Sequence, residues 1–195
     1  MRAISLLLLV LGLTACRPGT PTGEVADTPP TRADVWTAIQ PMARRYRIDA
    51  AFIYALVAAE SNFDPLARNG DARGLLQIKP RAWRNVATRP YEPYVWNWRA
   101  NLAVGVDYLA FSRATLHKRN VFSYPLLLAA FHYGLDYVEE HGFDADRIPV
   151  PDNPIYRKLW SGDLAPVKPP SQSGGARLEP FLQAGMQFRA AHRLG

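Results

Sequence analysis

Apolar residues recur at three- and four-residue intervals along the middle of the chain, which is the spacing of one face of an α-helix. Four segments show this pattern: residues 33–48, 50–61, 100–118 and 124–134. Asp49 is placed to cap the second segment, and Pro125 and Gly134 suit the start and the end of the fourth. Pro41 is expected to bend or interrupt the first. The alternation typical of strands is almost absent, so the pattern predicts a mainly α fold.

The first residues have the features of an export signal. Residues 1–15 carry a positive charge at Arg2 and an apolar run, ISLLLLVLGL, that is too short to span a membrane. The run leads into LTAC, which resembles the bacterial lipobox, where the cysteine is acylated and becomes the new first residue. Cys16 is the only cysteine in the sequence, so an internal disulfide is excluded. The alternative is an ordinary secretory signal with an incidental cysteine; we expect a lipid anchor at Cys16.

Composition divides the rest of the chain into three parts. Residues 16–32 are rich in Pro, Thr and Gly and should form a flexible tether behind the lipidated cysteine. Residues 33–165 contain the helical pattern and are enough for one sizeable core. Residues 166–195 read as a linker followed by a short amphipathic helix. That helix would pack on the domain or contact a membrane or a partner.

Charge narrows the choice of partner. The 195 residues are 48% apolar and 21% charged, and the formal net charge is +6. A basic protein suits an anionic partner such as nucleic acid, lipid headgroups or an acidic cell-wall polymer. Export and the absence of a basic binding module argue against nucleic acid. The four histidines show no spacing typical of metal ligands, so we expect no metal site.

Glu60 stands at the end of the apolar run ALVAA, where a carboxylate is costly unless it has a use. On a helix, Ile53, Leu56 and Val57 share its face. Burial and the negative end of the helix dipole would both favour the neutral acid over the carboxylate. A neutral acid can donate a proton to a leaving group. The alternative is that the helix frays at Ser61 and leaves Glu60 solvated, and spacing alone does not decide between the two.

The sequence around Glu60 resembles a known family. The helix ending in Glu-Ser is followed by ARGLLQIKP at 72–80, ANLAVGVDYLA at 100–110, LAAFHYG at 128–134 and a Pro- and Tyr-containing tail at 147–160. This order of motifs resembles the soluble-type (SLT) lytic transglycosylases. The resemblance covers about Met42 to Leu159.

The resemblance implies a lysozyme-like α fold and cleavage of the β-1,4 bond between N-acetylmuramic acid and N-acetylglucosamine in peptidoglycan. Glu60 matches the catalytic residue of the family, which protonates the glycosidic oxygen and then acts as base. The muramoyl C6 hydroxyl attacks C1 and gives a 1,6-anhydro product, so one carboxylate suffices and no cofactor is needed. Sugar contacts are expected from six residues of the matched motifs: Ser61, Asn69, Gly74, Gln77, Phe131 and His132.

The resemblance of the N-terminus to bacterial lipoproteins bears on location, and the family resemblance bears on partners. Arg17 after the lipidated cysteine is similar to lipoproteins sorted to the outer membrane of Gram-negative cells. We therefore expect a lipid-anchored protein of the cell envelope, facing the periplasm. Its partners would be peptidoglycan glycan strands and the membrane, and it could also serve the machinery of cell-wall synthesis or secretion.

Several motif positions depart from the family pattern. Leu76 replaces a Met, and Asn69 stands where a substrate-contacting Ser is usual. Phe131 and His132 replace a Tyr and an Asn. The missing Tyr normally hydrogen-bonds near the catalytic Glu, and Phe has no hydroxyl. His132 or Tyr108 could compensate.

Two alternatives stay open, and the departures at Phe131 and Asn69 are the reason for the second of them. One is a hydrolytic muramidase of the same fold, in which a second carboxylate such as Asp64 or Asp71 positions water. The other is a catalytically weak lipoprotein that binds peptidoglycan.

Overall fold

The computed structural model of the chain describes residues 28–170. The predictions for the signal segment, Cys16, residues 17–27 of the tether and the C-terminal helix lie outside these residues. The described part contains seven α-helices: α1 (Arg32–Tyr46), α2 (Ala50–Ser61), α3 (Pro80–Val86), α4 (Trp98–Lys118), α5 (Tyr124–His132), α6 (Leu135–Glu140) and α7 (Pro154–Trp160). Two short 3-10 helices, η1 (Tyr94–Trp96) and η2 (Ala145–Arg147), and the strands β1 (Arg68–Asn69) and β2 (Ala72–Arg73) complete it. The prediction of a mainly α fold is confirmed.

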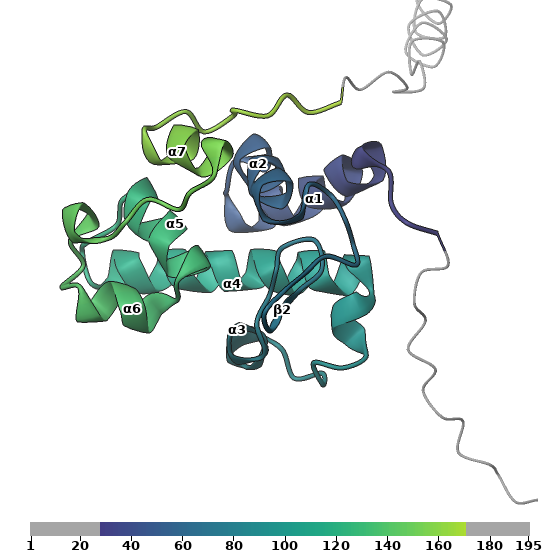
Figure 1. Ribbon diagram of the computed structural model, residues 1–195, viewed down its shortest axis with the longest axis horizontal. Helices are drawn as coiled ribbons and strands as arrows, with labels where there is room; N and C mark the ends of the chain where they lie inside the picture. Colours follow the sequence, from purple (N-terminus) through teal and green to yellow (C-terminus); the bar gives the residue numbers. More distant parts are fainter. Residues whose placement is uncertain (1–27, 171–195) are drawn as a thin grey trace, which may run out of the picture.

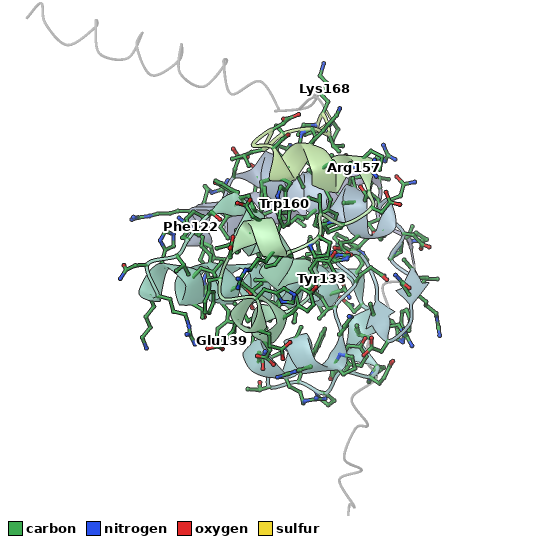
Figure 2. The ribbon with its side chains drawn as sticks, turned by 60° about the vertical axis from the view of Figure 1, so that its left-hand side comes forward. Phe122, Tyr133, Glu139, Arg157, Trp160 and Lys168 are labelled. Atoms are coloured by element: carbon green, nitrogen blue, oxygen red, sulfur yellow. The ribbon has the colours of Figure 1, made fainter. Side chains whose placement is uncertain are left out.

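Helix α4 is the longest element and the centre of the arrangement. It contacts α1, α3 and α5. In the view of Figure 1, α1, α2 and α7 lie on one side of α4, and α3 and α6 lie on the other. Helix α7 returns to pack against α2 and α5. Figure 2 shows α7, which carries the labelled Arg157 and Trp160, above Tyr133 at the end of α5. The end of the described chain therefore reaches back to its second helix.

The helix ends follow the local sequence. Asp49 caps α2, because its side chain accepts a hydrogen bond from the Ala51 N–H. Ser123 caps α5 in the same way, and Pro125 occupies its first turn. Pro41 lies inside α1 without interrupting it. The apolar face of α1 is buried along its length at Val35 and Ile39, so packing holds the helix together across the lost N–H.

The core surrounds α2 on every side. All six residues from Phe52 to Val57 are buried, although only some of them share the face that the periodicity picked out. The helix is therefore more deeply placed than a single apolar stripe implies. The hairpin β1–β2 follows it, with Arg68 paired to Arg73 and Asn69 to Ala72. Within residues 28–170, no helix is long and apolar enough to cross a membrane.

Candidate active site

Glu60 lies in the last turn of α2, and the helix does not fray there. Asn62 ends the helix in the left-handed conformation, with φ of 49°, and its N–H donates to the Ala58 carbonyl. The Glu60 side chain is 11% exposed. The solvated alternative is therefore wrong: the carboxyl group is largely withdrawn from water but still reaches the surface.

A tyrosine hydroxyl provides the hydrogen bond that Phe131 cannot. The Tyr156 hydroxyl, from α7, donates to Glu60 Oε1. Tyr156 is 1% exposed. Burial, with the added effect of the Glu60 charge, raises the pKa of Tyr156 well above its usual value near 10. The phenol therefore keeps its proton and remains a donor to Glu60.

The start of α7 holds Tyr156 in place. Asn153 caps the helix, because its Oδ1 accepts from the Ile155 N–H at 2.8 Å and the Tyr156 N–H at 3.3 Å. Its Nδ2 donates to the Ala59 carbonyl at 3.2 Å. One side chain thus fixes the first turn of α7 to the residue before Glu60.

His132 is the second polar neighbour of Glu60. Its Nδ1 lies 3.7 Å from Glu60 Oε1, and its side chain is 36% exposed. The ring meets Tyr133 and Tyr156 edge to face, with centroids 4.6 Å and 5.1 Å away. Of the two residues expected to compensate for Phe131, His132 therefore approaches Glu60.

Tyr108 does not make that approach. It is 4% exposed, and its ring packs against Phe131 at a centroid distance of 6.1 Å. Phe131 is half-buried and faces the pocket described below. The Tyr133 hydroxyl is also occupied elsewhere, because it donates to the Pro149 carbonyl at 3.0 Å. The hydroxyl near Glu60 therefore comes from α7 and from none of the residues around Phe131.

Ser61 connects α2 to the loop that follows the hairpin. Its hydroxyl lies 2.8 Å from the Leu75 carbonyl oxygen and 3.2 Å from the Val57 carbonyl oxygen, so it donates within the protein. The hydroxyl holds the loop beside the end of α2. A contact from Ser61 to sugar stays a prediction.

Gly74 lies where only glycine can pack. Its φ is +75°, and a Cβ there would lie 2.3 Å from Asn101 Nδ2. Asn101 is fully buried in α4. It accepts from the Leu76 N–H at 3.0 Å and donates to the Arg73 carbonyl at 2.8 Å and the Val95 carbonyl at 3.2 Å. The absence of a Cβ at Gly74 therefore makes room for the Asn101 side chain. A contact from Gly74 to sugar stays a prediction.

Gln77 and Asn69 occupy different surroundings. Gln77 Nε2 donates to the Gly74 carbonyl at 2.8 Å and the Ala67 carbonyl at 3.0 Å, which rigidifies the loop. Gln77 also lines the pocket. Asn69 is exposed on the hairpin and does not line it.

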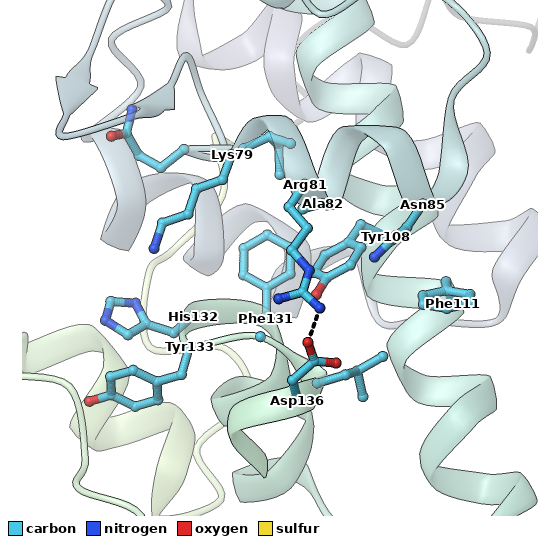
Figure 3. Close-up of a pocket in the computed structure, with 14 residues that line it drawn as sticks. Lys79, Arg81, Ala82, Asn85, Tyr108, Phe111, Phe131, His132, Tyr133 and Asp136 are labelled. Atoms are coloured by element: carbon cyan, nitrogen blue, oxygen red, sulfur yellow. Dashed lines mark hydrogen bonds and ion pairs between the residues drawn. The ribbon is translucent and has the colours of Figure 1, made fainter. Parts of the chain in front are cut away.

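A pocket adjoins the Glu60 cluster. Its volume is about 350 Å³, and its walls come from the Gln77 loop and from α3, α4, α5 and α6. Three of the expected sugar-contacting residues line it, namely Gln77, Phe131 and His132 (Figure 3). Ser61, Asn69 and Gly74 do not. His132 connects the pocket to Glu60, because it lines the pocket and its Nδ1 lies 3.7 Å from Glu60 Oε1.

Sequence reasoning missed two residues of the site. Tyr156 lies in the tail motif, but its contact with Glu60 spans 96 residues and leaves no local signal. Asn101 is an amide beside the apolar residues at the start of α4. A polar residue at a position that the helical pattern buries is expected to have a specific hydrogen-bonding role, and this was the available signal. Within residues 28–170, no group of three or more His, Cys, Asp or Glu side chains could hold a metal ion.

Comparison with known proteins agrees with this arrangement. The family model described as the transglycosylase SLT domain matches residues 37–143. The match includes α2 with Glu60, the hairpin, the Gly74 loop, α4 and α5, and it ends before α7. Searches of curated proteins and of solved structures gave no match. The matched length and the mainly helical fold show that this chain belongs to the transglycosylase SLT domain family, within the lysozyme-like superfamily.

Proposed function

We propose that this protein is a murein lytic transglycosylase. It cleaves the β-1,4 bond between N-acetylmuramic acid and N-acetylglucosamine and forms 1,6-anhydro-N-acetylmuramic acid. The family acts on peptidoglycan, which supports the substrate class. The observation that carries the proposal is the partly buried Glu60 carboxyl, which accepts from a tyrosine donor and lies 3.7 Å from His132. His132 lines the pocket, whereas Glu60 is not among the lining residues.

Glu60 performs both proton transfers. The protonated carboxyl group gives its proton to the glycosidic oxygen as the bond from C1 to that oxygen breaks. The resulting carboxylate then takes the proton of the muramoyl C6 hydroxyl as that oxygen bonds to C1. The proton count is unchanged after one turnover, and water takes no part in the bond changes.

The neighbours of Glu60 set which oxygen reacts. Oε1 accepts the Tyr156 hydrogen bond, so Oε2 is the oxygen that carries and receives the catalytic proton. His132 lies on the Oε1 side as well.

A hydrolytic muramidase is the first alternative. It needs a second carboxylate that positions water. The Asp64 side chain accepts a hydrogen bond from the Leu66 N–H at 2.8 Å, so its carboxylate stabilises the turn in which it lies. Of the described residues that line the pocket, only Asp136 is a carboxylate, and it pairs with Arg81. These contacts favour the transglycosylase.

The other alternative is a weakly catalytic binding protein. It was motivated by the departures at Phe131 and Asn69, and the Tyr156 hydroxyl supplies the hydrogen bond that Phe131 lacks. The departure at Asn69 remains. The experiment is to digest purified sacculi with the protein and with the Glu60→Gln variant and to identify the muropeptides by mass. We expect 1,6-anhydro ends and a loss of about 10²-fold or more in the variant.

The controls separate the three readings. Glu140→Gln changes an exposed carboxylate of α6 and should leave the products unchanged. Reducing ends in place of anhydro ends would identify a muramidase. Binding of sacculi without turnover by the unaltered protein would identify a binding protein.

The proposal also includes an envelope location through a lipid on Cys16. A lipid anchor would place the pocket within reach of the cell wall from the membrane surface. The Cys16→Ala variant should move from the membrane fraction to the soluble periplasmic fraction. An unchanged distribution between the two fractions would reject the anchor.

A further inference from the structure

Three charged side chains line the pocket beside Glu60: Lys79, Arg81 and Asp136. Arg81 and Asp136 form an ion pair between α3 and α6. The backbone carbonyl of Lys79 accepts from the Trp83 N–H at 3.0 Å, but its ammonium group makes no hydrogen bond or ion pair with any described residue. The pocket lining therefore carries one cation in excess, and that cation is the ammonium group of Lys79.

The three side chains differ in direction. Figure 3 shows Arg81 extending to Asp136, whereas Lys79 extends away from that pair, toward the side of the pocket where His132 lies. His132 is 3.7 Å from Glu60. The unpaired cation is therefore on the side of the pocket that leads to the proposed catalytic carboxyl. Arg81 is not available to a ligand in the same way, because Asp136 holds it.

The pocket accepts a small ligand with polar and apolar parts. Its volume of about 350 Å³ lies in the range typical of ligand sites. Phe111, Phe131 and Leu135 supply apolar surface, and Asn85 and Gln77 supply amides. An uncompensated ammonium group in such a pocket favours a ligand that carries an anion.

Peptidoglycan carries its ionised acids in one place. The sugar rings bear hydroxyl and acetamido groups, which are neutral. The lactyl carboxyl of muramic acid is consumed in the amide bond to the peptide stem. In an intact strand, the available carboxylates therefore belong to the stem.

We propose that Lys79 binds a carboxylate of the peptide stem and so makes the protein prefer glycan strands with ionised stems. This inference rests on the proposed function, because it concerns the substrate of the same site. Lys79 acts in specificity and takes no part in bond breaking. Its side chain is exposed, so the contact is screened by water and contributes about as much as a surface ion pair.

The test compares two substrates that differ only in stem charge. One is peptidoglycan strands with free stem carboxylates, and the other is the same strands after conversion of those carboxylates to methylamides. The measured quantity is kcat/KM for release of 1,6-anhydro products. We expect the unaltered protein to prefer the ionised strands by about two- to fivefold. The preference should shrink at high salt.

Variants connect the preference to Lys79. Lys79→Met should remove the preference by lowering kcat/KM on ionised strands alone, and Lys79→Arg should retain it. Lys79 precedes α3 without making a side-chain capping bond, so its replacement does not remove a helix cap. Lys118→Met makes the same change at an exposed lysine that is not part of the pocket lining and should keep the preference.

The outcomes are distinct. A preference that persists in Lys79→Met, or its absence in the unaltered protein, overturns the inference while leaving the proposed function intact. Equal losses by Lys79→Met on both substrates also overturn it, because the lysine would then serve something other than stem charge. An absence of anhydro products from both substrates with the unaltered protein rejects the proposed function itself.

Discussion

Tyr156 and Glu60 form the polar centre of the site at the scale of single residues. The hydroxyl lies on a side chain that is 1% exposed, and it meets a carboxyl group that is 11% exposed. The part-buried hydrogen bond from Tyr156 contributes about 0.5–1.5 kcal/mol while Glu60 is a neutral acid, and about 1.5–3 kcal/mol once Glu60 is a carboxylate. The raised pKa of Tyr156 keeps its proton in place across the working range of the protein. The orientation of the Glu60 carboxyl therefore depends on the Tyr156 hydroxyl, which keeps its proton below pH 10.

We predict that Tyr156→Phe lowers kcat/KM for release of anhydro products by about 10- to 100-fold, because Glu60 loses its fixed orientation. The ring is kept, so the variant should fold. Tyr46→Phe is the matched control, since the Tyr46 hydroxyl also donates to a carboxylate, Asp107 at 2.5 Å, in another part of the molecule. Equal activities of Tyr156→Phe and Tyr46→Phe would contradict this role.

The loop after the hairpin is held by neighbouring elements. Asn101 of α4 accepts from the Leu76 N–H of the loop and donates to the Arg73 carbonyl of β2 and the Val95 carbonyl of η1. Ser61 of α2 donates to the Leu75 carbonyl of the loop. Gly74 allows this approach because it has no Cβ. The loop contains Gln77 and leads into Lys79 and α3, so the shape of the pocket depends on contacts made behind it.

We predict that Asn101→Leu lowers the free energy of unfolding by about 3 kcal/mol or more. The leucine leaves the Leu76 N–H and the Val95 carbonyl without their partner, and each costs about 1–3 kcal/mol. The Arg73 carbonyl loses one donor but keeps the Ile78 N–H. Urea unfolding measures the change. Asn69→Leu alters an exposed amide and should change stability by less than about 0.5 kcal/mol. A loss in Asn101→Leu no larger than that of the control would show that the loop is held by other contacts.

Buried tyrosines couple the stability of the whole molecule to pH. Burial raises the pKa of Tyr54, Tyr91, Tyr108, Tyr133 and Tyr156 above the usual value, and for Tyr91 to about 12. Each phenol is therefore more strongly protonated in the folded state than in the unfolded state. The resulting stabilisation is complete below pH 10, the ordinary tyrosine pKa, and is lost as the pH rises through the folded values.

We predict a fall in stability that begins near pH 10. The midpoint of urea unfolding should decline between about pH 10 and pH 12, because the unfolded chain releases tyrosine protons first. Tyr156→Phe should show a shallower decline than the unaltered protein, since one of the contributing groups is gone. A midpoint that does not change up to pH 12 would show that these tyrosines are solvated in the folded protein.

The sequence alone predicted the segments that form α1, α2, α4 and α5, but not α3, α6 or α7, and it named Glu60 as the candidate acid. Helical periodicity, Asp49 and Gly134 were sufficient to predict α2 and α5, because caps and apolar spacing act within one or two turns. Glu60 was identified by its position in an apolar run and by the motifs that follow it in order. The motifs of the family are defined by residue types and by their order along the chain, so they can be identified from the sequence alone.

The tertiary structure decided what surrounds Glu60. The burial of its carboxyl, the Tyr156 donor and the approach of His132 all depend on α7 and α5 returning to α2. The pairing of Arg81 with Asp136, which leaves Lys79 as the unpaired cation of the pocket, likewise joins separate elements. The spacing of residues in the sequence describes one element at a time. Hydrogen bonds and ion pairs act over a few ångströms, and here they join elements that lie far apart in the chain. The sequence therefore determined which residue is the candidate acid, and only the packing of α7 and α5 determined which groups contact and orient its carboxyl.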